Sequence, residues 1–107
     1  MSELSLSDGT SMVYSDVGQG QPVVMLHGWA MSGGAFWPQD ALADQFRVIR
    51  PDLRGFGASV PTPSVSISEM ARDISALLAA LDLEGVILIG WSMGAAVGWH
   101  VLLGEQS

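Results

Sequence analysis

The 107-residue chain contains no cysteine and no lysine, and both absences narrow what it can be. Without cysteine it has no disulfide and no thiolate metal site, and thiol usage says nothing about its redox compartment. Its four basic residues are all arginines, against eleven acidic residues. An acidic surface repels the phosphate backbone of nucleic acids, so we expect no nucleic-acid partner.

Charged residues make up only 14% of the chain and hydrophobic residues 49%, which favours a buried core over disorder. No apolar run approaches the roughly 20 residues of a membrane helix. The opening Met1-Ser2-Glu3-Leu4 lacks the basic and then apolar pattern of a secretory signal. We therefore expect residues 1–107 to form one domain in the cytoplasm, with no membrane partner.

Short apolar segments alternate with helix-compatible ones. Residues 4–7 and 11–17 flank Asp8-Gly9, a dipeptide suited to a tight hairpin turn. The runs at 22–26 and 86–89 are apolar throughout, as in parallel strands covered on both faces. A further strand is expected at 46–50, and a short helix at 35–44. The pattern predicts an α/β fold, an initial β-hairpin followed by parallel strands with helices on both faces.

The clearest helix is expected over residues 67–81. Its apolar residues recur at spacings of three and four, which predicts one buried face. Ser66 and Glu69 stand in the S-x-x-E relation of a capping box and mark its N-terminus.

The segment Gly90-Trp91-Ser92-Met93-Gly94 matches G-x-S-x-G between an apolar strand and a helix, the context in which this motif presents a nucleophilic serine. Gly90 and Gly94 give the sharp turn room. The backbone amide of Met93 would face a developing oxyanion at the helix N-terminus. The alternative is a chance match, or glycines that only allow close helix packing.

Three blocks in this order resemble the signature of serine-nucleophile α/β-hydrolases, over about residues 14–104. The blocks are His27-Gly28-Trp29, then Asp52-Leu53-Arg54-Gly55-Phe56-Gly57-Ala58-Ser59, then Gly90-Trp91-Ser92-Met93-Gly94. The residues of these blocks look most like those of bacterial carboxylesterases that cleave pimeloyl-carrier-protein methyl esters. Related esterases and cofactor-free haloperoxidases share many of the same residues. A serine at the centre of the elbow argues against the branches that use a carboxylate nucleophile.

The resemblance implies that Ser92 is the nucleophile and that the backbone amides of Trp29 and Met93 form the oxyanion hole. Trp29 and Trp91 would line the acyl pocket, although a tryptophan beside a strand end is often part of the core. The loop residues with a structural role would be His27, Gly28, Gly90 and Gly94, with His27 bracing the loop.

Asp52 and Arg54 look like charged catalysts, but in this motif they are expected to shape the loop after the strand rather than touch substrate. This chemistry needs neither a metal nor an organic cofactor.

The chemistry also needs a histidine base and a carboxylate, which follow the serine in this fold. His100 lies eight residues on, about 12 Å along a regular helix, and would point away from the Ser92 hydroxyl. The other downstream candidates are Glu105 and the C-terminal carboxylate. We therefore expect the N-terminal half of an α/β-hydrolase fold, ending after the elbow helix, with residues 86–89 as an exposed apolar sheet edge.

Three hypotheses remain open. The first is a part of an esterase that hydrolyses small-molecule esters through an acyl-enzyme, with this chain catalytically incomplete. The second is a non-enzymatic half-domain that self-associates through the exposed sheet edge or complements a C-terminal half. The third is a cofactor-free haloperoxidase or perhydrolase of the same fold.

Overall fold

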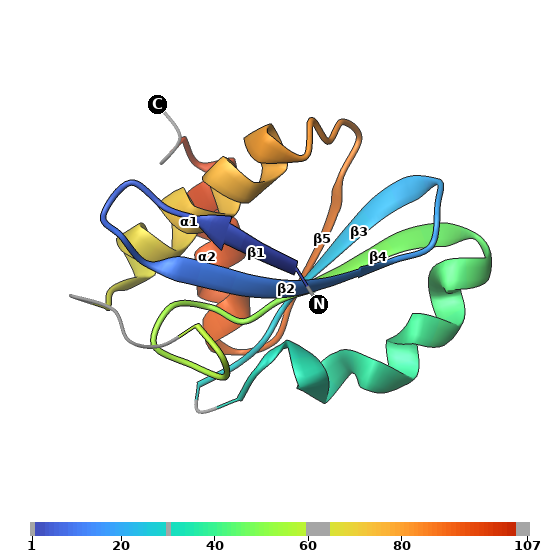
Figure 1. Cartoon of the computed structure of the whole chain (residues 1–107), viewed down its shortest axis with the longest axis horizontal. Coiled ribbons are helices and arrows are strands. Elements are labelled where there is room, and N and C mark those ends of the chain that lie inside the picture. Colours follow the sequence, from blue (N-terminus) through green and yellow to red (C-terminus); the bar gives the residue numbers. More distant parts are fainter. Residues whose placement is uncertain (1, 30, 60–64, 105–107) are drawn as a thin grey trace.

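The computed structural model describes residues 2–29, 31–59 and 65–104. In these residues one mixed sheet runs through the molecule, with helices on both faces (Figure 1). Its five strands are β1 (Ser2–Ser5), β2 (Ser11–Val17), β3 (Gln21–Leu26), β4 (Phe46–Pro51) and β5 (Ile87–Gly90). The helices are η1 (Gly33–Asp44), α1 (Ile67–Ala80) and α2 (Met93–Leu102). The expected α/β architecture is confirmed.

The strand order is β1-β2-β4-β3-β5. β1 pairs antiparallel with β2, and β2 with β4, whereas β3 runs parallel to both β4 and β5. Leu26, the last residue of β3, is in register with Gly90, the last residue of β5. The loops that follow these two strands therefore leave the sheet side by side.

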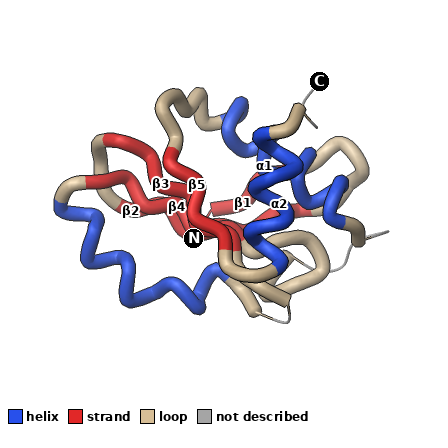
Figure 2. The backbone as a smooth tube through the Cα atoms, turned by 180° about the vertical axis from the view of Figure 1, so that it is seen from behind, coloured by secondary structure: helices blue, strands red, loops and turns tan. Residues whose placement is uncertain are grey.

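Helix α1 begins as the sequence predicts. The Glu69 backbone N–H donates to the Ser66 side-chain oxygen at 3.1 Å, so Ser66 caps the helix. Met70, Ile74 and Leu77 are buried, as the spacing requires. α1 and α2 pack against each other on one face of the sheet, visible at the right of Figure 2.

Two elements differ from the sequence-based expectation. The segment expected as a short helix at 35–44 is a 3-10 helix over Gly33–Asp44, with Pro38 inside it. Proline has no N–H to donate and disfavours a regular α-helix interior. The first strand is Ser2–Ser5 rather than 4–7, because the hairpin turn already begins at Leu6, whose N–H donates to the Thr10 carbonyl at 2.8 Å.

The core is unequal on the two faces of the sheet. The larger cluster lies beneath α1 and α2 and includes Leu26, Ile49 and Leu53. On the η1 face a smaller cluster of Val23, Met25 and Val48 packs with partly buried residues of η1 and β4. No helix among the described residues is long and apolar enough to cross a membrane.

Candidate active site

Ser92 stands at the turn between β5 and α2. Its backbone has φ 55° and ψ −112°, outside the allowed wells for an L-residue, and it occupies the N-cap position of α2. The residue is exposed. Its hydroxyl therefore lies at the surface above the sheet, at the N-terminus of a helix.

The two glycines of the motif make this turn possible. A Cβ atom at Gly90 would lie 2.6 Å from the Ala95 backbone nitrogen, and one at Gly94 would overlap the Leu26 carbonyl oxygen. The Trp91 N–H donates to the Leu26 carbonyl at 3.0 Å, which ties the turn to the end of β3. No larger residue fits at either glycine without moving the backbone.

The loop after β3 lies directly beside this turn. A Cβ atom at Gly28 would lie 2.8 Å from Trp91 Cδ1 and 3.3 Å from the Met31 sulfur, so Gly28 leaves room for the Trp91 indole. Within the described part of the chain, no hydrogen bond is assigned to the backbone N–H of Trp29 or of Met93. An oxyanion hole requires amides that are not already engaged.

His27 is buried, and its ring contacts two loops. The Leu53 N–H donates to Nε2 at 2.9 Å, so the ring proton resides on Nδ1, which donates to the Gly28 carbonyl at 2.8 Å. Burial lowers the pKa of His27 below its usual 6.5. The imidazole is therefore neutral, with both nitrogens engaged, and connects the loop after β3 to the loop after β4.

Asp52 and Arg54 both have partners within the protein. The Asp52 carboxylate accepts from the Gly33 N–H at 2.8 Å and from the Ala58 N–H at 2.9 Å. A Cβ atom at Gly57 would overlap this carboxylate. Asp52 thus holds the start of η1 and the loop after β4 together.

Arg54 is buried beside α1. It pairs with both oxygens of Asp73, at 2.7 and 2.8 Å, and also contacts Asp8 and Glu69. These carboxylates raise the Arg54 pKa above its usual value, and the Asp8 pKa falls to about 2 through its backbone hydrogen bond with Thr10 and its bond with Arg54. The cluster joins the β1–β2 turn to α1.

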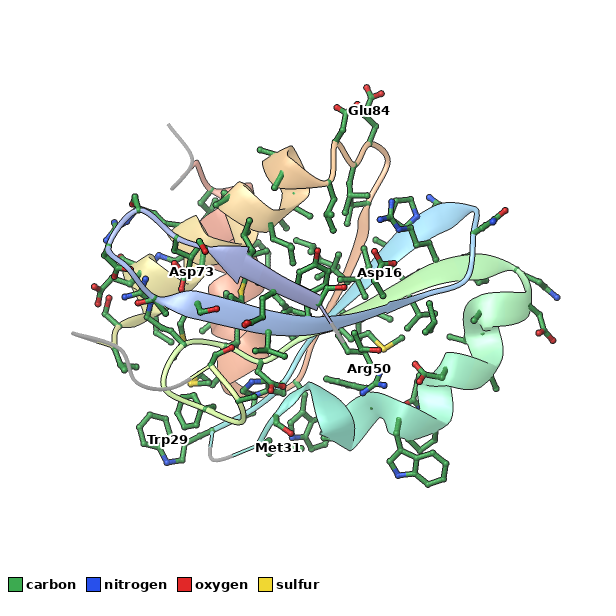
Figure 3. All side chains as sticks on the ribbon, in the orientation of Figure 1. Asp16, Trp29, Met31, Arg50, Asp73 and Glu84 are labelled. Carbon is green, nitrogen blue, oxygen red and sulfur yellow. The ribbon has the colours of Figure 1, made fainter. Side chains whose placement is uncertain are left out.

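Two tryptophans stand at the same end of the sheet. Trp29 is 69% exposed and Trp91 63% exposed, so neither is a core residue. Figure 3 shows Trp29 at the outside of the molecule, at the end where Met31 also lies. Trp91 borders an apolar cavity of about 350 Å³, together with Met25, Met31, Ala35, Phe36, Gln39 and Ile89.

Phe56 is a site residue that sequence reasoning missed. Its ring makes edge contacts with Trp29, at 5.1 Å between centroids, and with His27, at 5.8 Å. The flanking Gly55 and Gly57 both have positive φ, a signal that the loop turns sharply around Phe56. The ring supports the loop that carries the Trp29 amide.

The remaining candidates for base and acid are not brought to Ser92 by any described contact. His100 lies in α2, eight residues after Ser92. Glu105 lies outside the described residues. Among the described residues no group of three or more histidine, aspartate or glutamate side chains could hold a metal ion.

Comparisons with known proteins identify the family to which this fold belongs. Residues 21–107 match the model of the alpha/beta hydrolase fold family. The chain is 43% identical over 88 residues to a pimeloyl-[acyl-carrier protein] methyl ester esterase of Vibrio cholerae, covering 80% of this chain and 32% of that protein. It is 42% identical over 90 residues to a non-heme chloroperoxidase of Kitasatospora aureofaciens, covering 81% and 33%.

Among solved structures, an esterase from Exiguobacterium antarcticum matches with a TM-score of 0.90 and 37% identity, over 95% of this chain and 39% of that one. The chain thus spans about a third of the curated relatives' length and corresponds to their N-terminal part. The family match covers most of the sequence, and the chain belongs to the α/β-hydrolase family.

Proposed function

We propose that Ser92 is the nucleophile of an acyl-transfer site that hydrolyses small-molecule esters through an acyl-enzyme. The observation that carries this proposal is the backbone of Ser92, held at φ 55° and exposed between β5 and α2. Such strain is retained where the surrounding structure enforces it, often at catalytic positions. Epoxide hydrolases also occur among the relatives, but a serine hydroxyl supports acyl transfer better than it supports a carboxylate mechanism.

The oxyanion hole proposed for this site uses the backbone amides of Trp29 and Met93. The Met93 amide lies at the N-terminus of α2, where the helix dipole favours negative charge. His27 and Phe56 would act as positioning residues by fixing the loop that contains Trp29. Trp29 and Trp91, both largely exposed at this end of the sheet, would form walls for the acyl group.

By itself this chain is proposed to be catalytically incomplete. A serine becomes a strong nucleophile when a histidine accepts its proton. The sequence has two histidines. His27 has both ring nitrogens in hydrogen bonds, and His100 lies about 12 Å along α2. In the proposed enzyme, base and acid come from the part of the fold that follows Ser92 in the relatives.

The test is a chimera in which this chain replaces the matched N-terminal part of the Exiguobacterium antarcticum esterase. We expect it to hydrolyse p-nitrophenyl butyrate, and Ser92→Ala to lower kcat by roughly 10⁴-fold or more. Ser68→Ala, in α1, is the matched control and should retain the rate. A folded chimera that is inactive, or one that survives Ser92→Ala, contradicts the proposal.

The second candidate function is association through the open edge of β5, with another copy of the chain or with a complementing segment. It is favoured by the position of β5 at the end of the sheet and by the exposure of Ile87 and Ile89. Light scattering across a concentration series tests it. The cytoplasmic location, and the description of residues 1–107 as one partial domain, remain proposals.

A further inference from the structure

Met31 differs from the other methionines of the described structure in its access to solvent. It is 36% exposed, whereas Met12, Met25 and Met70 are at most 1% exposed. Met93 is partly buried and packs against the core beneath α1 and α2. A methionine sulfur is oxidised faster the more freely the oxidant can reach it. Within the described part of the chain, a dissolved oxidant therefore reaches Met31 first.

The Met31 sulfur lies where the loop after β3 meets the turn at Ser92, at the same end of the molecule as Trp29 (Figure 3). A Cβ atom at Gly28 would lie 3.3 Å from this sulfur and 2.8 Å from Trp91 Cδ1. The sulfur and the indole are thus within about 6 Å of each other, close to the separation of favourable sulfur–aromatic contacts. The Met31 N–H also donates to the Gly28 carbonyl at 3.2 Å. Met31 therefore connects Trp91 to the loop that contains Trp29.

The Met31 side chain also borders the apolar cavity of about 350 Å³ beside η1. Among the described residues that line this cavity, only Gln39 has a side chain that is neither apolar nor aromatic. A thioether suits these surroundings, because it is apolar and polarisable. A sulfoxide does not, because its oxygen is a hydrogen-bond acceptor that is unfavourable to bury without a donor. Oxidation of Met31 would therefore weaken its packing against Gly28 and Trp91.

We propose that Met31 is a redox-sensitive modification site, at which a peroxide forms methionine sulfoxide and loosens the loop after β3. The sulfur lone pair attacks one peroxide oxygen, the O–O bond breaks and an S–O bond forms. The second oxygen takes the proton of the transferred oxygen and leaves as water, or as an alcohol when the oxidant is an organic hydroperoxide. The sulfur loses two electrons and the peroxide gains them. Methionine sulfoxide reductases reverse this change.

The loop that Met31 holds carries the Trp29 amide, which the proposed function assigns to the oxyanion hole. Separate contacts also hold this loop, since His27 bonds to the Gly28 carbonyl and the Phe56 ring contacts Trp29. These contacts do not involve the sulfur, so we expect local loosening rather than unfolding. Control of ester hydrolysis by peroxide rests on the proposed function, whereas sulfoxide formation and loosening of the loop do not.

The test treats the full chain with hydrogen peroxide and follows each methionine by peptide mass spectrometry. We expect Met31 to gain one oxygen atom at least about tenfold faster than Met12, Met25 and Met70. Hydrogen exchange at the amides of the loop after β3 should then become at least about threefold faster, while exchange in α1 stays the same. Treatment with methionine sulfoxide reductase should restore the original exchange.

Met31→Leu is the matched control, since leucine has a similar volume and no sulfur, and peroxide should leave the exchange of its loop unchanged. Met31→Gln places a polar side chain at this position without an oxidant and should speed exchange in the same loop. Circular dichroism verifies that each variant is folded. Equal oxidation of Met31 and the buried methionines, or a Met31 sulfoxide that leaves the loop exchange unchanged, overturns the proposal. Neither readout uses ester turnover, so a failure here leaves the assignment of Ser92 untouched, and an inactive chimera leaves Met31 untouched.

Discussion

At Ser92 the backbone is strained where the nucleophile is proposed. Among the described residues only Ser92 and Asp82 have positive φ without being glycine, and the ψ of −112° at Ser92 lies far from the left-handed well. Such a conformation costs about 1–3 kcal/mol. Stability is therefore given up at the residue that the proposed chemistry needs.

Replacing Ser92 tests this cost. Ser92→Gly should raise the free energy of unfolding by about 1 kcal/mol relative to Ser92→Ala, because glycine adopts positive φ without a Cβ clash. Both variants lack the hydroxyl, so the comparison isolates the backbone. Urea unfolding measures the difference, and equal midpoints would mean that the turn holds no strain.

Gly94 and Gly98 lie in the same helix but have different surroundings. A Cβ atom at Gly94 would overlap the Leu26 carbonyl oxygen, whereas one at Gly98 would lie 3.8 Å from Leu26 Cδ1, an ordinary contact. Gly94→Ala should therefore destabilise the chain by about 2–3 kcal/mol. Gly98→Ala should be neutral or stabilising by up to about 1 kcal/mol, through helix propensity. Denaturant unfolding of both variants tests this, and similar losses would contradict it.

At the scale of elements, His27 joins the loops after β3 and β4, and its protonation should weaken that link. Burial lowers its folded-state pKa below 6.5. At pH values between the folded-state and the unfolded-state pKa of His27, the unfolded chain binds more protons than the folded chain does. The contribution of His27 to the free energy of unfolding is therefore fully present above about pH 6.5 and falls as pH decreases through the folded-state pKa. Denaturant unfolding midpoints measured from pH 7.5 to pH 5.5 test this loss of stability.

The matched comparison for this pH dependence uses the two histidines of the chain. His27→Gln should reduce the dependence, while His100→Gln should leave it in place. If His27→Gln retains the full dependence, another group is responsible.

Local sequence patterns predicted much of the fold. They did not predict contacts between residues that are far apart in the sequence. Helical periodicity and the Ser66 cap located α1, and the apolar runs located β3 and β5 to within a residue or so. The 3-10 geometry of η1 was not foreseen, although Pro38 was visible in the sequence. The pairing of Arg54 with Asp8, 46 residues away, and the contacts of Phe56 depend on how elements fold together, which no local spacing encodes. The roles of Gly90 and Gly94 in the turn at Ser92 could be predicted because the G-x-S-x-G motif is a local pattern.

At the scale of the whole molecule, one group of exposed apolar side chains lies along the open edge of the sheet and on the helix beside it. Ile87 and Ile89 of β5, Trp99 and Leu102 of α2, and the neighbouring Leu103 are all exposed, from 39% to 77%. No charged side chain lines the cavity beside Ile89 or the one beside Leu88. Such a group of exposed apolar side chains is typical of an interaction surface rather than of a face in contact with water.

The positions of the two histidines in the whole molecule determine how much ester hydrolysis we expect from this chain alone. Both ring nitrogens of His27 are in hydrogen bonds, and His100 lies about 12 Å along α2 from Ser92. We therefore expect p-nitrophenyl acetate and butyrate to turn over at the same rate, within about twofold, in the wild-type chain and in Ser92→Ala. Steady-state absorbance measures both rates, with light scattering in the same buffer to determine the oligomeric state. Activity that disappears in Ser92→Ala would require a base from this chain or from a partner copy. A monomer would then implicate His100, and an oligomer would implicate a residue supplied across the interface.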